Sequence, residues 1–488
     1  MSETDIDGTD HPAGTLAGGP GSVTSRSEYR DVIEGSIPWA LGRLALPTWG
    51  TFVLLNAMGL IDMFWVGKLG STAVAAVTMG GIMIGIVVML ALGVEVGTTA
   101  LVANAVGREE RRHAGKVAAQ GLLISLAMAG GLAAVAVPLA PLILQGLGAT
   151  PEVVRSGTPY LRIVAGGGVT IMLQISLGAA LRGAGDASTP FKAMGLANIA
   201  NITSDPILIF GLLGMPALGV AGSGWATVGS RVLGVALMLQ VLFTRGRSAV
   251  DIRLEDMKPR FDIMQRIVRI GIFASGRALL RNVGRLAMLR MAAVFGMGAV
   301  AAFGICFRLQ LLVLGPGKGF GAAAATMVGQ NLGARQPRRA EVSGWIAAGI
   351  GLCLGFLFTA GFWAAPGGLI KLFNSDPDVV KAGVPLVRWF SASFPLLVVG
   401  LVLGEAMNGA GDSLRPMLIT GLAQVLLALP LAGMLAASWN SAEGIWTGLF
   451  AGNVLVGVLA AGAFYVAWWK DVGEPGSGVF ASAGEMEE

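Results

Sequence analysis

The stretch Leu181-Arg182-Gly183-Ala184-Gly185-Asp186 occurs a second time, slightly altered, as Met407-Asn408-Gly409-Ala410-Gly411-Asp412. The two copies are 226 residues apart, and the same offset aligns residues 69–76 with 295–302 and residues 151–162 with 377–388. The register holds without a gap from about residue 69 to about residue 190, through polar loops as well as apolar runs. We therefore infer an internal duplication, which in a membrane chain is typical of a transporter with two lobes.

The composition places this duplicated chain in a membrane. Of its 488 residues, 54% are hydrophobic and only 13% are charged, against roughly 25% charged residues in soluble domains. The 74 glycines fit the same class, because small residues let helices approach closely in lipid. The net charge of +5 comes mostly from short loops between apolar runs, so it does not indicate nucleic-acid binding. The two cysteines lie in apolar stretches and predict no disulfide framework.

Apolar runs long enough to span a bilayer, about 20 residues each, occur six times in each repeat. They cover residues 37–65, 72–103, 115–138, 160–181, 190–213, 218–243, 263–294, 298–329, 341–365, 383–407, 415–437 and 444–469. The predicted fold is an all-α polytopic membrane protein with twelve transmembrane helices in two pseudo-symmetric six-helix bundles.

The placement of Lys and Arg in the loops predicts the orientation. These residues collect on one side, including residues 108–116 and 244–262, and this side is expected in the cytoplasm. We expect a multi-pass protein of the plasma (inner) membrane with both termini cytoplasmic. Its parts are a disordered N-tail (1–34), an N-lobe (35–243), a cytoplasmic inter-lobe loop (244–262), a C-lobe (263–470) and a C-tail (471–488).

Some motifs are more specific than the apolar runs. They are Ile61-Asp62-x4-Gly67-x-Leu69-Gly70, the loop from Leu181 to Asp186, and Asn198-x2-Asn201-x3-Asp205-Pro206. With these motifs the chain resembles the MATE family (multidrug and toxic compound extrusion), in its DinF-like branch, over roughly residues 37–469. The resemblance implies a V-shaped pair of bundles and cation-driven export of amphipathic, often cationic, compounds. We expect no cofactor beyond the coupling ion, H+ or Na+, and a monomer in the lipid bilayer.

Four acidic residues lie at membrane depth, namely Asp62, Glu95, Asp205 and Glu405. An ionisable residue there is costly in lipid, so it normally faces protein or water and suggests a functional site. Asp62 and Asp205 both lie near the outer ends of their spans and are predicted to share one pocket of the N-lobe. Two carboxylates in a low-dielectric pocket do not both ionise cheaply, so the pair either holds a proton or binds a cation.

The sequence around Asp205 also suits a cation. Asn201 and Asp205 are spaced i, i+4 and share one helix face, and Pro206 frees a backbone carbonyl one turn earlier. Hard cations prefer such oxygen ligands. Weaker candidates for the same shell are Gln174, Ser223 and Thr227. The resemblance carries over Asp62, Asn201 and Asp205 as residues matching the coupling-ion site of the family's N-lobe. The alternative is that Asp205 caps a kinked segment and Asp62 ends its helix near the headgroups.

The C-lobe carries cations instead of acids at membrane depth. Arg277, Arg281 and Arg285 form a stripe at i, i+4, i+8, and no Asp or Glu occurs from residue 263 to residue 340. A cation site on this segment is therefore doubtful. The arginines either pair with Glu405, carbonyls or headgroups, or line a substrate cavity and select carboxylates or phosphates, with Glu405 and Glu95 as further cavity candidates. A misplaced helix boundary is the third alternative.

Three prolines are candidate hinges, because proline interrupts the helical hydrogen bonds. They are Pro47, Pro206 and Pro316, and the last lies in a Gly-Pro-Gly run that is expected to break or kink its helix. The repeated Gly-Ala-Gly-Asp loops are predicted to be tight turns with Asp186 and Asp412 as helix caps. Tyr160 is predicted to be an anchor at the membrane interface.

Other functions compete with ion-coupled export. A flippase for lipid-linked precursors such as polyprenyl diphosphates, from the same superfamily, is encouraged by the arginines. A major-facilitator transporter also has twelve spans, but its acid-plus-basic loop signature is absent at residues 107–111. A membrane-embedded enzyme has little support, because His11 and His113 form no His/Glu helix pair and no phosphate-loop motif is present. The protein is expected to be a transporter and not an enzyme.

Overall fold

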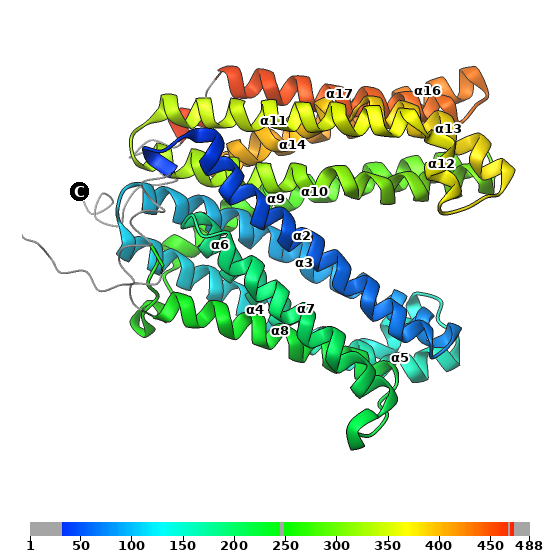
Figure 1. Ribbon diagram of the computed structural model, residues 1–488, viewed down its shortest axis with the longest axis horizontal. Helices are drawn as coiled ribbons and strands as arrows, with labels where there is room; N and C mark the ends of the chain where they lie inside the picture. The colour runs from blue at the N-terminus through cyan, green and yellow to red at the C-terminus, as the bar shows by residue number, and fades with distance from the viewer. Residues whose placement is uncertain (1–31, 245–247, 467–468, 473–488) are drawn as a thin grey trace, which may run out of the picture.

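The computed structural model describes residues 32–244, 248–466 and 469–472, and nearly all of them are helical (Figure 1). The first lobe contains α2 (Ile37–Gly67), α3 (Ser71–Gly107), α4 (Arg111–Gly146), α5 (Pro151–Gly166), α6 (Gly168–Gly183), α7 (Ser188–Phe210), η1 (Leu212–Gly214) and α8 (Val220–Phe243), followed by η2 (Leu254–Met257). The second contains α9 (Phe261–Ala293), α10 (Met297–Gly333), α11 (Pro337–Ala364), α12 (Pro366–Lys371), α13 (Pro377–Ala392), α14 (Phe394–Gly409), α15 (Leu414–Thr420), the π-helical η3 (Gly421–Ala428), α16 (Leu429–Trp439), α17 (Glu443–Val466) and α18 (Trp469–Val472). The predicted tails lie almost entirely outside the described residues.

The described helices confirm the polytopic membrane fold. Ten spans are long and apolar enough to cross a bilayer, and the pair α13–α14, bent by 48°, forms an eleventh. Helix α9 is 33 residues long and is not among these apolar spans, because it carries six arginines. Counting α9, the described chain has the twelve predicted spans. Large apolar side chains such as Leu60, Leu286 and Met434 are exposed on the outside of the bundles, as lipid contact requires.

Two spans begin earlier than predicted, at Pro151 and Pro377 instead of residues 160 and 383. Their first turns are polar, so a search for apolar runs misses them, although Thr150 and Asp376 cap both helices. Each of these spans is then broken, at Gly167 and Ser393, between α5 and α6 and between α13 and α14. These two positions are also 226 residues apart, so the duplication repeats even the break.

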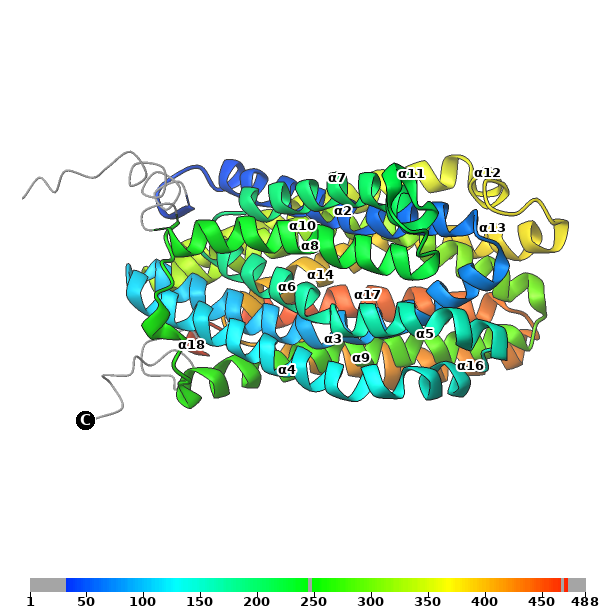
Figure 2. The same cartoon turned by 90° about the horizontal axis from the view of Figure 1, so that it is seen from below.

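The molecule has the shape of a V (Figure 1). Helices α2–α8 form one arm and α10–α17 the other, and the arms diverge toward the end that carries α5, α12 and α13. We call this the open end and the opposite one the closed end. Figure 2 shows the long helices of both arms aligned with the long axis of the molecule.

Glycines bring the two lobes together at the closed end. A Cβ atom on Gly93 of α3 would lie 2.9 Å from the carbonyl oxygen of Gly271 in α9. A Cβ on Gly333 would lie 3.0 Å from the Cα of Gly107. Because Gly107 and Gly333 are equivalent residues of the two repeats, the pseudo-twofold axis passes between them. The repeat seen in the sequence is therefore also a spatial symmetry.

The repeated Gly-Ala-Gly-Asp loops are tight turns, as predicted. Gly185 and Gly411 adopt φ angles of 93° and 83°, which L residues rarely tolerate. Asp186 accepts hydrogen bonds from the backbone N–H groups of Ser188 and Thr189 at the start of α7. The side chain of Gln330 on α10 donates to the carbonyl of Gly183 at 2.8 Å, so the first loop also joins the lobes.

Candidate functional site

The structure brings four of the predicted ion-site residues together inside the N-lobe. Asp62 comes from α2, Asn201 and Asp205 from one face of α7, and Thr227 from α8. The Thr227 hydroxyl donates to the Asp62 carboxylate at 3.1 Å. Asp205 and Asn201 also lie beside Asp62. The pocket that the sequence predicted therefore forms between α2, α7 and α8.

This cluster is buried in the N-lobe and contains many polar atoms that have no hydrogen-bond partner in the described part of the chain. Asn201 and Asp205 are 0% exposed, as is Ser223, one turn before Thr227 on α8. Within the described residues, no hydrogen bond reaches either carboxylate oxygen of Asp205, either polar atom of the Asn201 amide, the Ser223 hydroxyl or Asp62 Oδ1. Burying so many polar atoms without partners is costly. A proton on the acids, or a cation held by these oxygens, removes that cost.

The described residues contain no group of three or more His, Cys, Asp and Glu that could hold a metal ion. Among the residues that the structure describes, two carboxylates, Asp62 and Asp205, meet in this pocket. A Na+ ion here would therefore depend on amide and hydroxyl oxygens as well, and Asn201, Ser223 and Thr227 are the residues that offer them.

Arg231 is a neighbour of the site that the sequence interpretation missed. It is 7% exposed and lies within electrostatic range of Asp62. Ser223, Thr227 and Arg231 are spaced i, i+4, i+8 on α8, and this spacing was the available signal. The cluster thus combines two carboxylates with one guanidinium group.

Tyr160 does not lie at the membrane interface, so its prediction as an anchor is wrong. It is 3% exposed and packs between α3 and α8, where a Cβ on Gly80 would lie 2.6 Å from its ring and one on Gly224 3.3 Å. Like Arg231, it lies within electrostatic range of Asp62. Gly80 and Gly224 leave space for the ring inside the lobe. This packing involves three separate helices, so the position of Tyr160 in the sequence does not reveal it.

Two other predicted residues lie apart from this cluster. The Gln174 amide donates to the sulfur of Met194, seven residues before Asn201 on α7 and hence roughly 10 Å along the helix. Glu95 forms an ion pair with Arg182 at 2.5 Å. Membership of Gln174 in the ion site and of Glu95 in the substrate cavity stays a prediction.

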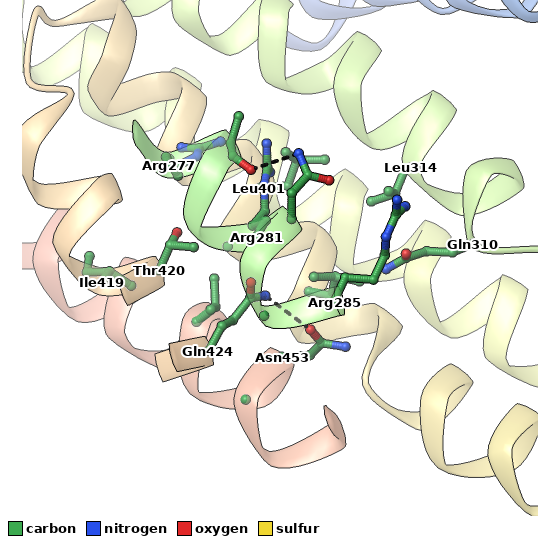
Figure 3. A pocket seen from close by; sticks show the side chains of 18 of the residues that line it. Arg277, Arg281, Arg285, Gln310, Leu314, Leu401, Ile419, Thr420, Gln424 and Asn453 are labelled. Atoms are coloured by element: carbon green, nitrogen blue, oxygen red, sulfur yellow. Dashed lines mark hydrogen bonds between the residues drawn. The ribbon is translucent and has the colours of Figure 1, made fainter. Parts of the chain in front are cut away.

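A second cavity, of about 350 Å³, lies within the C-lobe (Figure 3). We call it the C-lobe cavity. Its charged lining residues are Arg277, Arg281, Arg285 and Lys318, and its amides are Asn282, Gln310, Gln424 and Asn453. Figure 3 shows the three arginines on one helix and Arg285 extended toward Gln310 and Leu314. Leu92 of α3 also contributes, so the cavity borders the N-lobe.

The arginines of this cavity divide into two kinds. Arg277 is paired with Glu405 at 2.6 Å, and Glu405 also accepts a hydrogen bond from Asn408. Arg281 and Arg285 are exposed to the cavity, as is Lys318. Of the two alternatives, Arg277 fits pairing with an acidic residue, whereas Arg281 and Arg285 fit the lining of a cavity.

The cavity wall beside α9 has a feature that the sequence analysis did not find. Residues 421–428 are π-helical, and Pro430 has no N–H to donate to the carbonyl of Leu426. This segment places Gln424 in the cavity wall, where its amide donates to Asn453 at 3.5 Å. By contrast, α10 runs unbroken through Pro316, so this proline interrupts no helix here. Hinge bending at Pro47, Pro206 and Pro316 stays a prediction.

One family model, MatE, matches this chain twice, over residues 47–207 and 275–434. The chain belongs to the MatE family. The two matched segments fall on the two repeats. Each half of the chain therefore matches the family model by itself.

Similar proteins are found over nearly the whole length of this MatE chain. It is 27% identical over 432 residues to a probable multidrug resistance protein NorM of Thermotoga maritima, covering 88% of this chain and 92% of the relative. It is 25% identical over 433 residues to an FAD transporter of Shewanella oneidensis, covering 88% and 94%. A crystal structure of MATE in complex with MaL6 matches with a TM-score of 0.82 at 25% identity, covering 89% of this chain and 97% of that one. Placement in the DinF-like branch stays a prediction.

Proposed function

We propose that this MatE protein is a secondary active antiporter that exports amphipathic small molecules in exchange for H+ or Na+. The observation that carries the proposal is the buried N-lobe cluster, with its two carboxylates and its oxygen atoms that accept no hydrogen bond within the described residues. The exporters among the relatives support the direction of transport, since one is named for multidrug resistance. We further propose that the protein is a monomer of the plasma (inner) membrane with its termini and the closed end in the cytoplasm.

The charge of the cluster suits a single monovalent ion. Asp62 and Asp205 contribute two negative charges and Arg231 one positive charge, so one proton or one Na+ ion neutralises the site. Asp62 and Asp205 lie near the ends of α2 and α7 at the open end, so the ion enters from outside. Neutralisation removes the repulsion between the carboxylates and lets α2, α7 and α8 pack more closely.

Helix α2 is the element that couples this site to the substrate. It packs on α7 in its own lobe and on α10 in the other. Pro47 of α2 lies about 15 residues, roughly 22 Å, from Asp62 along the helix. Near Pro47, α2 and α10 are in close contact. A Cβ on Gly315 of α10 would lie 3.1 Å from the indole nitrogen of Trp49, and one on Gly319 would lie 2.7 Å from the carbonyl oxygen of Ala45. A change of bend in α2 therefore displaces α10 beside Lys318.

The first experiment is dye uptake into liposomes that contain the purified protein, under a Na+ gradient or a pH gradient imposed separately. The gradient that drives uptake by the wild type identifies the coupling ion. We expect Asp205→Asn to abolish gradient-driven uptake, because an amide can neither take up a proton nor attract a cation as a carboxylate does.

The matched control is Asp186→Asn, which makes the same chemical change in a loop at the closed end. Asn caps helices about as well as Asp, so this variant should transport normally. Gradient-driven uptake that persists in Asp205→Asn would show that the N-lobe cluster is not the coupling site.

A further inference from the structure

The C-lobe cavity has a net positive charge that its own walls do not neutralise. It is lined by Arg277, Arg281, Arg285 and Lys318, and no Asp or Glu belongs to the lining among the described residues. Glu405 neutralises Arg277 through their ion pair. The other acid at this depth, Glu95, is bound by Arg182. Three positive charges therefore remain in excess.

Within the described residues these three cations form no direct ion pair, although Glu405 lies within electrostatic range of Arg281 and Lys318. Arg285 lies 5.5 Å from the ring of Phe307, and the Lys318 ammonium 5.1 Å from the ring of Phe52. Contacts with aromatic faces orient a cation but leave its hydrogen-bond donors available. Charges at membrane depth without an ion pair are costly, and an anionic ligand in the cavity would balance them.

The arrangement suits a phosphate or a carboxylate. Arg281 and Arg285 are one helical turn apart on α9, so their side chains start about 6 Å from each other on one face. Guanidinium groups bind such anions through paired N–H donors. Lys318 approaches from α10, and its contact with Phe52 of α2 places it at the boundary between the lobes.

Besides these cations and the amides, the cavity is lined by large apolar side chains, which take the body of the ligand. Leu311, Leu314, Phe390 and Leu397 are among its lining residues. Its volume of about 350 Å³ fits a small organic molecule, since such sites span roughly 300–1,000 Å³. The ligand is thus amphipathic, with an anionic group at one end.

We propose that the C-lobe cavity binds an amphipathic organic anion through Arg281, Arg285 and Lys318, with a phosphate or carboxylate between them. This inference deepens the proposed function by naming the substrate class, and it rests on that function only for the direction of transport. Binding itself is independent of ion coupling. The phosphate group can belong to a soluble molecule or to a lipid headgroup.

The test is equilibrium binding to the purified full-length protein in neutral detergent. The probes are naphthyl phosphate as a soluble amphipathic anion, phosphatidic acid as a lipid, and ethidium as a cation. We expect saturable binding of naphthyl phosphate or phosphatidic acid, weakened at least about tenfold by Arg281→Gln or Arg285→Gln and by added salt. Whichever anion binds identifies the source of the phosphate.

The matched control is Arg290→Gln, on the same helix but outside the cavity lining, which should bind both anions like the wild type. Arg281→Lys, which keeps the charge but loses the paired donors, should give an intermediate affinity. Binding of ethidium but of neither anion, or equal losses in Arg281→Gln and Arg290→Gln, would overturn the proposal. Asp205→Asn should bind the anions normally, so a failure of the coupling site is distinguishable from a failure of this cavity.

Discussion

At the scale of single residues, the arginines of α9 differ in what surrounds them, although they share a helix face. Arg277 is 7% exposed at its side chain and forms an ion pair with Glu405, whose side chain is 25% exposed. Arg281, one turn further, lines the C-lobe cavity and forms no direct ion pair within the described residues. The same residue type thus serves the stability of the fold at one position and the binding of a ligand at the next.

This difference predicts different effects of the same substitution on the free energy of unfolding. Arg277→Gln should lower the free energy of unfolding by roughly 2–4 kcal/mol, because it leaves the Glu405 carboxylate without its partner. Arg281→Gln should leave this free energy unchanged or raise it, because it removes a positive charge that repels its neighbours. Both are measured by equilibrium unfolding in mixed micelles. A larger loss in Arg281→Gln than in Arg277→Gln would contradict the assignment.

At the scale of elements, the glycines of α3 have two different functions. Gly93 and Gly97 face α9 at the closed end, and a Cβ on Gly97 would lie 2.4 Å from the carbonyl oxygen of Ile267. Gly85, three turns nearer the open end, has no other atom within 4 Å of the corresponding position. The first two let α3 and α9 approach, whereas the third contributes only to the helix. Close backbone approach is how membrane helices pack without a hydrophobic driving force.

Gly97→Ala should therefore separate the lobes at the closed end and destabilise the protein by roughly 1–3 kcal/mol, because the contact is with rigid backbone. Gly85→Ala should be neutral or stabilise by up to about 1 kcal/mol, as alanine favours helix. Spin labels at Arg111→Cys and Arg338→Cys, both exposed at the closed end, measure the separation in a chain whose exposed Cys353 is replaced by Ser. If the distance between the two spin labels is unchanged in Gly97→Ala, the contact between Gly97 and Ile267 does not hold the lobes together.

At the scale of the whole molecule, the segment between the lobes is fixed to the N-lobe. The Gln120 side chain of α4 donates to the carbonyls of Asp256 and Lys258 and accepts from the N–H of Arg260. Asp256 is 3% exposed and pairs with Arg112 at 2.7 Å. Because α9 begins directly after these contacts, the start of the C-lobe is held against the N-lobe while the open ends remain free to move.

Asp256→Ala should release this segment, at a local cost of about 1–3 kcal/mol, because Arg112 and the Arg253 N–H lose their shared acceptor. Amides of residues 250–260 should then exchange with solvent faster, as measured by hydrogen–deuterium exchange. Glu255→Ala, next to it but 60% exposed at its side chain, serves as the control and should speed exchange much less than Asp256→Ala at neutral pH.

Acid should weaken the same attachment slightly. The hydrogen bond from Arg253, together with the charge of Arg112, holds the pKa of the Glu255 carboxyl below its ordinary value of 4.5. Because the pKa of Glu255 is lower in the folded state, the stabilisation by its ionised carboxylate is present above pH 4.5. It is lost as the pH falls through the folded-state pKa. Once each rate is divided by the intrinsic exchange rate at that pH, Glu255→Gln should remove this acid dependence, and a dependence that survives would assign it to another group.

The sequence by itself determined the membrane class, the duplication, the spans and the neighbourhood of Asp62 and Asp205. These follow from local rules, because hydropathy, repeat spacing and depth along a helix can be counted along the chain. Tertiary structure alone decided that Arg231 and Tyr160 join the acids, that Arg277 pairs with Glu405 while Arg281 faces the C-lobe cavity, and that Gly107 meets Gly333. Those outcomes depend on which helix faces meet across different spans, and the period of a single helix does not specify its neighbour.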